Sequence, residues 1–157
     1  MKSLWFLSAA VLTFALSACQ RTQIAGSDRD AHGCIGSAGY VWSPLTGACV
    51  RVFEAGLPFE PTAMNPEQNY RVYLVTSLSN TGRLKAAELF WPGESTLWTL
   101  DVTDKTGDTA RRLVLQSAAH KLKIYRTAES AYLLEQNGRV VYVFGPKKGN
   151  PLDSIGQ

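Results

Sequence analysis

Residues 132–144 have the sequence YLLEQNGRVVYVF. Two runs rich in strand-forming residues flank Asn137-Gly138, the strongest two-residue signal for a type I′ turn, because both central residues of that turn need a positive φ. The stretch therefore predicts an antiparallel β-hairpin.

The two-residue turn also fixes the register of this hairpin. It places Leu134 opposite Val141 and Tyr132 opposite Val143. These four residues share one face, and we expect that face to lie against the core. The opposite face is half apolar and carries the cross-strand pairs Glu135 with Val140 and Leu133 with Tyr142.

The chain between residues 71 and 144 repeats this kind of pattern. Alternation with a period of two is far more common there than the 3.6-residue period of helices. Strand formers are concentrated in the segments 71–76, 84–91, 97–102, 113–115, 122–125, 132–134 and 140–144. Turn signals separate them, among them Pro92-Gly93 and Asn80-Thr81-Gly82. Seven or eight short strands joined by turns predict a mostly β fold, a small antiparallel barrel or sandwich.

An apolar run, LWFLSAAVLTFAL, occupies residues 4–16 and follows Lys2. Its length is typical of the cleaved helix of a signal peptide and is below the roughly 18 residues of a membrane-spanning helix. A conventional secretory peptidase prefers small residues one and three positions before its cut. A cut after Ala18 would place bulky Leu16 at the second of these positions, so the site suits another peptidase better.

The string Leu16-Ser17-Ala18-Cys19 resembles the lipobox of bacterial lipoproteins and matches it at every position. The resemblance implies a diacylglyceryl group on the Cys19 sulfur, cleavage before Cys19 and, in Gram-negative bacteria, acylation of the new amino group. The reaction needs a thiol because sulfur is the nucleophile that takes the lipid. Two or more acyl chains hold a protein on a membrane. The alternative is a secretion signal that ends on an unrelated cysteine.

The residue after Cys19 bears on localisation. Gln20 replaces the Asp that retains many enterobacterial lipoproteins at the inner membrane, so the family rule implies the inner leaflet of the outer membrane, facing the periplasm. Removal of Lys2 with the signal lowers the formal net charge from +3 to +2. Such a weak bias, in an exported chain, argues against nucleic acid as a partner.

Composition divides the chain into four parts. Residues 1–18 are the expected signal peptide, and the polar residues 19–33 are an expected lipidated tether. Residues 34–144 form a single expected β-domain. Residues 145–157 contain two prolines and three glycines and predict a flexible C-terminal tail.

With Cys19 assigned to lipid, Cys34 and Cys49 remain. An even number of cysteines in an exported chain predicts a disulfide. It would close a loop of about 16 residues and contribute about 3 kcal/mol to stability. A zinc site is the competing interpretation, but His32 and His120 are the only histidines and make a poor ligand set. A redox pair is disfavoured because such cysteines are usually two residues apart.

The segment around these cysteines is the most distinctive part of the mature chain. Pro44 and Gly47 predict a turn, so 40–42 and 48–50 are expected to pair as a disulfide-pinned hairpin. The segment resembles a group of uncharacterised bacterial lipoproteins in five motifs: Gly-Cys at 33–34, Ser-Ala-Gly-Tyr at 37–40, Trp-Ser at 42–43, Cys-x-Arg-x-Phe-Glu at 49–54, and Ala-Glu-Leu-Phe at 87–90 with Pro92. This resemblance implies no activity.

Two groups of residues are candidates for binding a partner. Tyr40 and Trp42 alternate and would share a face, where their rings could stack on a sugar or on an apolar patch of a protein. The alternative is that they pack over the disulfide and cover one end of the barrel.

The second group is basic and includes Arg111, Arg112, Lys121, Lys123 and Arg126. The alternation that turns Leu113, Leu115, Leu122 and Ile124 inward would turn Arg112, Lys121 and Lys123 outward as one stripe. Such a stripe could meet phosphate groups of lipid, an anionic cell-wall polymer or an acidic protein. The alternative is a solvated face that discourages edge pairing.

Catalytic patterns are sparse. Neither histidine has an evident base or nucleophile nearby in sequence, and no phosphate loop or dinucleotide fingerprint is present. Glu88 and Glu94 flank an aromatic stretch, and Asp101, Asp104 and Asp108 lie near a turn, so a carboxylate pair for glycoside chemistry stays open. We expect no enzyme and no cofactor.

The sequence thus favours a membrane-anchored lipoprotein that acts as a non-enzymatic binding or envelope-structural module. Its partners would be membrane lipid through acylated Cys19 and an envelope protein, glycan or secreted enzyme. The first alternative is a periplasmic inhibitor of lysozyme-type enzymes, since the chain is similar in outline to the membrane-bound lysozyme inhibitors. The second is a glycan-modifying enzyme with two carboxylates in a cleft.

Overall fold

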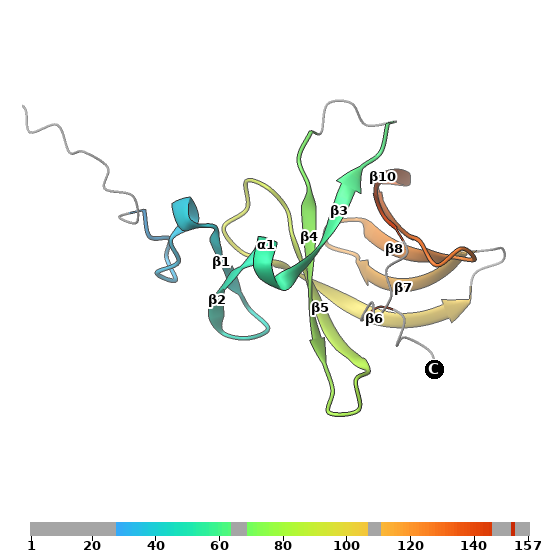
Figure 1. The fold of residues 1–157 in the computed structure, drawn as a ribbon, viewed down its shortest axis with the longest axis horizontal. Helices are drawn as coiled ribbons and strands as arrows, with labels where there is room; N and C mark the ends of the chain where they lie inside the picture. Colours follow the sequence, from blue (N-terminus) through green and yellow to red (C-terminus); the bar gives the residue numbers. More distant parts are fainter. Residues whose placement is uncertain (1–27, 64–68, 107–110, 146–151, 153–157) are drawn as a thin grey trace, which may run out of the picture.

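The computed structural model describes residues 28–63, 69–106, 111–145 and 152. The described residues form ten strands and two short helices (Figure 1). In chain order these are η1 Gly36–Ala38, β1 Tyr40–Ser43, β2 Ala48–Arg51, α1 Val52–Ala55, β3 Gly56–Pro61, β4 Val72–Leu78, β5 Leu84–Phe90, β6 Trp98–Thr106, β7 Arg111–Ser117, β8 Leu122–Thr127, β9 Tyr132–Gln136 and β10 Arg139–Phe144.

Strands β3 to β10 form a closed antiparallel barrel in which each strand pairs with the next along the chain. The barrel closes where β10 pairs with β3, with Tyr142 opposite Pro61 and Val143 opposite Glu60. β1 and β2 form a separate two-stranded sheet. The prediction of a mostly β fold with one disulfide is confirmed, and the architecture is the barrel rather than the sandwich.

One strand of the barrel was not predicted. β3 has the sequence GLPFEP, and its two prolines argue against a strand because proline cannot donate to a ladder of hydrogen bonds. It nevertheless pairs with both neighbours, and its Phe59 is fully buried. Without β3 the barrel could not close.

Side chains fill the barrel interior. Large residues from opposite walls, such as Phe59 on β3 and Ile124 on β8, belong to one apolar cluster and are fully buried. The other large side chains buried to the same degree in this cluster are Tyr132, Tyr142, Leu74, Leu89, Leu115, Leu122, Leu134, Leu152 and Val72. An eight-stranded barrel has an interior just wide enough for such packing, so the inside is a core.

The β9–β10 hairpin follows the predicted register only next to its turn. Val140 lies opposite Glu135 as predicted, but a β-bulge then shifts the pairing so that Tyr142 lies opposite Leu134. The core face therefore carries Tyr142 and Phe144 in place of Val141 and Val143, and that part of the prediction was wrong. The extra residue turns two aromatic rings inward.

The segment after β3 forms hydrogen bonds with the bulge. The Thr62 amide donates a hydrogen bond to the Val141 carbonyl at 2.9 Å, and the Thr62 hydroxyl donates to the Val140 carbonyl at 3.3 Å. The bulged backbone thus gains partners from the neighbouring strand, in keeping with the near-obligatory pairing of buried backbone groups.

Two predicted boundaries need revision. The predicted signal peptide (1–18) and most of the predicted tether lie outside the described residues, but residues 28–33 of that tether are folded against η1. The predicted tail, 145–157, is described only at Gly145 and Leu152. Leu152 is fully buried in the barrel core, so at this described position the predicted tail belongs to the folded domain.

The helices in the described part of the chain are all too short to cross a bilayer.

We expect Gly138→Val to destabilise the barrel by about 1–3 kcal/mol, the usual cost of a residue forced into a sparsely populated backbone conformation. Asn137 and Gly138 have φ values of 51° and 80° and form the β9–β10 turn, where a β-branched side chain is strained. Urea unfolding measures the loss. Gly138→Asn is the control and should lose much less, because Asn tolerates the left-handed region. Equal midpoints for the valine and asparagine variants would contradict this account of the turn.

Candidate functional site

The β1–β2 hairpin packs on the outside of the barrel, across β4 and β5. Glu88 on β5 lies opposite Val75 on β4, on the outer face of both strands, yet its side chain is fully buried. Its carboxyl oxygens accept a hydrogen bond from the Ser43 hydroxyl at 2.5 Å and one from the Leu45 amide at 2.7 Å. The hairpin turn is thereby fixed to the barrel wall.

An apolar layer lies beneath the hairpin. Val41 from β1 and Val52 from α1 pack against Val75 of the barrel and Leu97 of the β5–β6 loop, and all four are buried. The backbone adds a second connection, because the Leu97 amide donates to the Trp42 carbonyl at 3.0 Å. The hairpin and the barrel therefore share a small second core.

The disulfide between Cys34 and Cys49 is confirmed, and it joins the segment before η1 to β2. Hydrogen bonds order the same segment. The Asp30 carboxylate accepts from the Cys34 amide at 2.9 Å, and the Asp28 carboxylate accepts from the Ser37 amide and hydroxyl. The hairpin is thus held on one face by the barrel and on the other by the N-terminal segment.

Tyr40 and Trp42 lie on the hairpin face that points away from the barrel. Trp42 stacks on His32 with 4.4 Å between ring centroids and 5° between planes. Tyr40 lines a hollow of about 310 Å³ together with both cysteines and Arg29. Trp42 therefore packs against the N-terminal segment, Tyr40 borders a hollow beside the disulfide, and both lie on the hairpin outside the barrel.

Other aromatic residues cover the end of the barrel where β5 ends and β6 begins. Trp91 and Trp98 stack at 5.1 Å, and His120 from the β7–β8 turn stacks on Trp98 at 3.8 Å. The edge of Tyr142 meets Trp91, and burial, together with the nearby Tyr70, raises the pKa of the Tyr142 hydroxyl far above its usual value. Trp91 and Trp98 are partly buried and pack against the barrel core.

The predicted basic stripe is divided by the structure. A bulge in β7 leaves Arg112 paired with Arg126, on the sheet face that also carries Leu122 and Ile124. Lys123 lies near the other end of β8, opposite Gln116, on the outer face. Lys121 is in the turn before β8, with a φ of 49°, rather than in a strand. The prediction of one outward stripe was wrong for Arg112, because the alternation was extended through a bulge.

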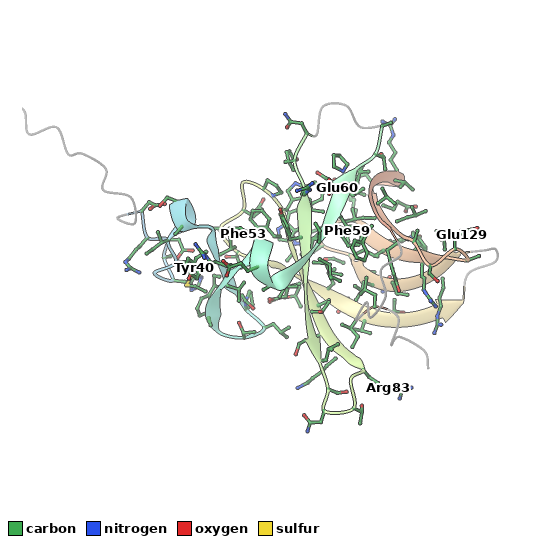
Figure 2. All side chains as sticks on the ribbon, viewed as in Figure 1. Tyr40, Phe53, Phe59, Glu60, Arg83 and Glu129 are labelled. Atoms are coloured by element: carbon green, nitrogen blue, oxygen red, sulfur yellow. A yellow bond between two sulfur atoms is a disulfide. The ribbon has the colours of Figure 1, made fainter. Side chains whose placement is uncertain are left out.

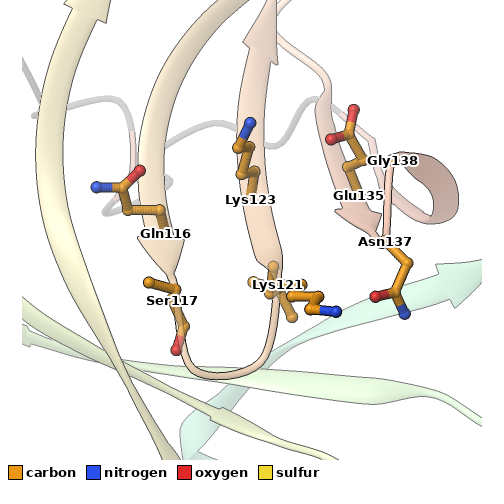
Figure 3. Close-up of a pocket in the computed structure, with 9 residues that line it drawn as sticks. Gln116, Ser117, Lys121, Lys123, Glu135, Asn137 and Gly138 are labelled. Carbon is orange, nitrogen blue, oxygen red and sulfur yellow. The ribbon is translucent and has the colours of Figure 1, made fainter.

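Lys121 and Lys123 are brought together in a groove on the outer wall formed by β7, β8 and β9 (Figure 3). The groove has a volume of about 430 Å³ and is lined also by Gln116, Ser117, Ala118, Leu122, Glu135, Asn137 and Gly138. We call it the lysine groove. A hydrogen bond from the Asn137 amide to the Lys121 carbonyl, 3.0 Å long, joins the two turns at its end.

The charges in the lysine groove are available to a ligand. Both lysines are exposed, and within the described residues no ion pair is formed by either, although Lys123 lies directly opposite Glu135 in the sheet. The groove thus combines two ammonium groups, which can bind an acidic group, with the amides of Gln116 and Asn137, which can hydrogen-bond to neutral groups.

The lysine groove and the hairpin lie on opposite walls of the barrel. The hairpin covers β4 and β5, whereas the groove is centred on β8, which is four strands from β4 in either direction around the barrel. Figure 1 shows the hairpin at the left of the molecule and β7 and β8 at the right. Binding at one wall therefore leaves the other wall free.

Groups suited to catalysis are dispersed. His32 and His120 are each stacked on a tryptophan, and Glu88 is enclosed beneath the hairpin. In the part of the chain that the structure describes, no group of three or more His, Cys, Asp or Glu residues could hold a metal ion.

Comparisons with known proteins found no match to this chain among family models, curated proteins or solved structures.

The role of Glu88 was not predicted from sequence. The alternation of buried Ala87 and Leu89 places Glu88 on the outer face of β5, where a carboxylate normally meets water. This position is buried only because the hairpin turn, more than 40 residues earlier in the chain, covers it. No local signal in the sequence carries that information.

We expect Glu88→Ala to destabilise the domain by about 2–4 kcal/mol, because it removes two hydrogen bonds and leaves the buried Ser43 hydroxyl without its acceptor. Chemical unfolding measures the loss, and amide exchange at residues 40–51 should become faster. Glu94→Ala in the exposed β5–β6 loop is the matched control and should change stability by no more than about 0.5 kcal/mol. If the two variants unfold at the same denaturant concentration, Glu88 does not hold the hairpin.

Proposed function

We propose that this chain is a lipid-anchored, non-enzymatic binding module of the bacterial cell envelope, and that the lysine groove is its binding surface. The anchor is supported by the lipobox-like residues Leu16 to Cys19. The Cys34–Cys49 disulfide is consistent with an oxidising compartment such as the periplasm. The inner leaflet of the outer membrane is the location that Gln20 favours.

The observation that carries the binding role is the pair of lysines in the groove. Lys121 and Lys123 are exposed on a rigid closed barrel, and no ion pair to either is found within the described ranges. Since side chains fill the barrel interior, a ligand has to bind on the outside. The groove offers such a place, with a volume of about 430 Å³ on the outer wall.

The chemistry of the groove favours an acidic glycan of the envelope. Two ammonium groups suit the carboxylates or phosphates of such a polymer, and the Gln116 and Asn137 amides and the Glu135 carboxylate suit its hydroxyl groups. Because the groove is on the wall opposite the hairpin, it stays accessible when the N-terminal side of the molecule is near a membrane. The alternative of a lysozyme-type inhibitor gains no specific contact from this geometry.

We expect Cys19→Ser to release the protein from the envelope, because loss of the thiol removes the site of lipid attachment. Cell fractionation and flotation of membranes measure the distribution of the protein. Wild-type protein should float with the outer membrane, and the variant should be found in the soluble fraction. A Cys19→Ser protein that still floats would remove the lipid anchor from the proposal.

We expect the double reversal Lys121→Glu/Lys123→Glu to weaken binding of the soluble domain, residues 20–157, to soluble acidic peptidoglycan fragments by at least about tenfold, or about 1.4 kcal/mol. Isothermal titration calorimetry measures the affinity, which should also fall with added salt. Arg83→Glu/Lys85→Glu is the matched control, because it makes the same charge change at exposed positions on β5 and the turn before it.

Three results would count against the glycan. These are no binding by the wild-type domain, equal weakening by both double variants, and binding of an acidic protein in place of the glycan. The last result would still support the groove as the binding surface but would identify its ligand as an acidic protein.

A further inference from the structure

The outer face of the hairpin carries a cluster of two aromatic rings around one cation. The guanidinium of Arg51 lies 5.3 Å from the ring centre of Tyr40 and 5.3 Å from that of Phe53. Arg51 also forms an ion pair with Glu54 and donates a hydrogen bond to the Ala38 carbonyl. We call Tyr40, Arg51 and Phe53 the hairpin cluster.

Phe53 is exposed and yet held in place. Its side chain is on the short helix α1, and the residue is 51% exposed, the largest exposure of any large apolar residue in the described ranges. Gly39 fixes one side of the ring, since a Cβ added there would lie 2.2 Å from the Phe53 ring. The Phe53 ring is thus held by Gly39 and Arg51 while about half of the residue is exposed to solvent. An exposed ring held in this way is typical of a contact surface.

A hollow of about 310 Å³ adjoins the cluster. Tyr40 lines it together with the disulfide, Ile35 and Arg29. Its walls are mainly apolar, and Arg29, which is exposed, supplies a cation at its border. The combination of aromatic rings, an apolar hollow and two arginines matches the chemistry of a phospholipid headgroup region, where rings lie at the interface and cations meet phosphates.

The described residues begin next to this face, so an anchor at Cys19 would hold the face near a membrane. The first described residue, Asp28, contacts Ser37 next to the hairpin cluster. Only eight residues lie between Cys19 and Asp28, so the nine steps from one to the other span at most about 32 Å. Figure 2 shows Tyr40 and Phe53 on the side of the barrel where the described chain begins. Such a short tether gives the face an effective concentration at the bilayer of about a millimolar or more, so a weak contact is populated.

We infer that the hairpin cluster and its hollow contact the headgroup region of the bilayer that carries the anchor, so that the domain sits on the membrane through its hairpin and presents the lysine groove away from it. This inference rests on the proposed lipid anchor. Phe53 and Tyr40 enter the interface, and Arg29 and Arg51 meet lipid phosphates.

The test uses the full lipidated protein in vesicles of phosphatidylethanolamine and phosphatidylglycerol. A nitroxide label is attached at Phe53→Cys and, as the control on the opposite wall, at Lys123→Cys. Electron paramagnetic resonance compares collisions of each label with oxygen, which concentrates in lipid, and with a nickel chelate, which stays in water. We expect the ratio of oxygen to nickel collisions to be several-fold higher at position 53 than at position 123. Equal ratios would overturn the inference.

A second measurement does not depend on an added cysteine. Amide hydrogen exchange of the unlabelled lipidated protein in the same vesicles is compared with that of Cys19→Ser in solution. Slower exchange over residues 36–55, without a change over residues 117–138, supports the inference, and unchanged exchange over 36–55 overturns it. Failure of the wild-type protein to float with the vesicles would instead remove the anchor, so the two failures are distinguishable.

Discussion

The buried carboxyl group of Glu88 is the interaction on which the arrangement of the two sheets depends. A closed barrel has no free edges and can stand by itself, but a two-stranded hairpin is marginal in water and has to be held. Glu88 provides two acceptors where the hairpin turn meets the barrel wall. The disulfide ties the hairpin to the N-terminal segment. Val41 and Val52 supply buried apolar area between the hairpin and the barrel.

The sequence motifs at residues 33–54 and 87–90 are joined to one another in this arrangement. Gly39 leaves room for the ring of Phe53, and Arg51 joins the Ser-Ala-Gly-Tyr motif to the Phe-Glu motif through the Ala38 carbonyl and Glu54. The Ser of the Trp-Ser motif donates to Glu88 of the Ala-Glu-Leu-Phe motif. Residues that are far apart in sequence therefore form one unit, and their contacts hold the hairpin on the barrel.

Sequence reasoning succeeded where structure is determined locally. The Asn137-Gly138 turn, the hairpin between 40 and 50 and the disulfide all follow from residue types at short spacing. It failed where one extra residue alters the alternation, as in the bulges at Val141 and in β7, because a bulge reverses the facing of every residue beyond it. The lysine groove was predicted in part, since Lys121 and Lys123 were singled out. Their neighbours Glu135 and Asn137 come from another hairpin and could not be placed from sequence.

The connection of the N-terminal segment to the hairpin has a mechanical consequence. A force applied to the chain before Asp28 first reaches Cys34, and the disulfide passes it to Cys49 in the middle of the hairpin. From there it is divided between the Glu88 contacts and the apolar layer on β4 and β5, along a broad area of the barrel wall. The barrel is consequently not unzipped from the free end of a strand. The disulfide thus directs tension on the N-terminal segment into the side of the barrel wall, where many contacts share it.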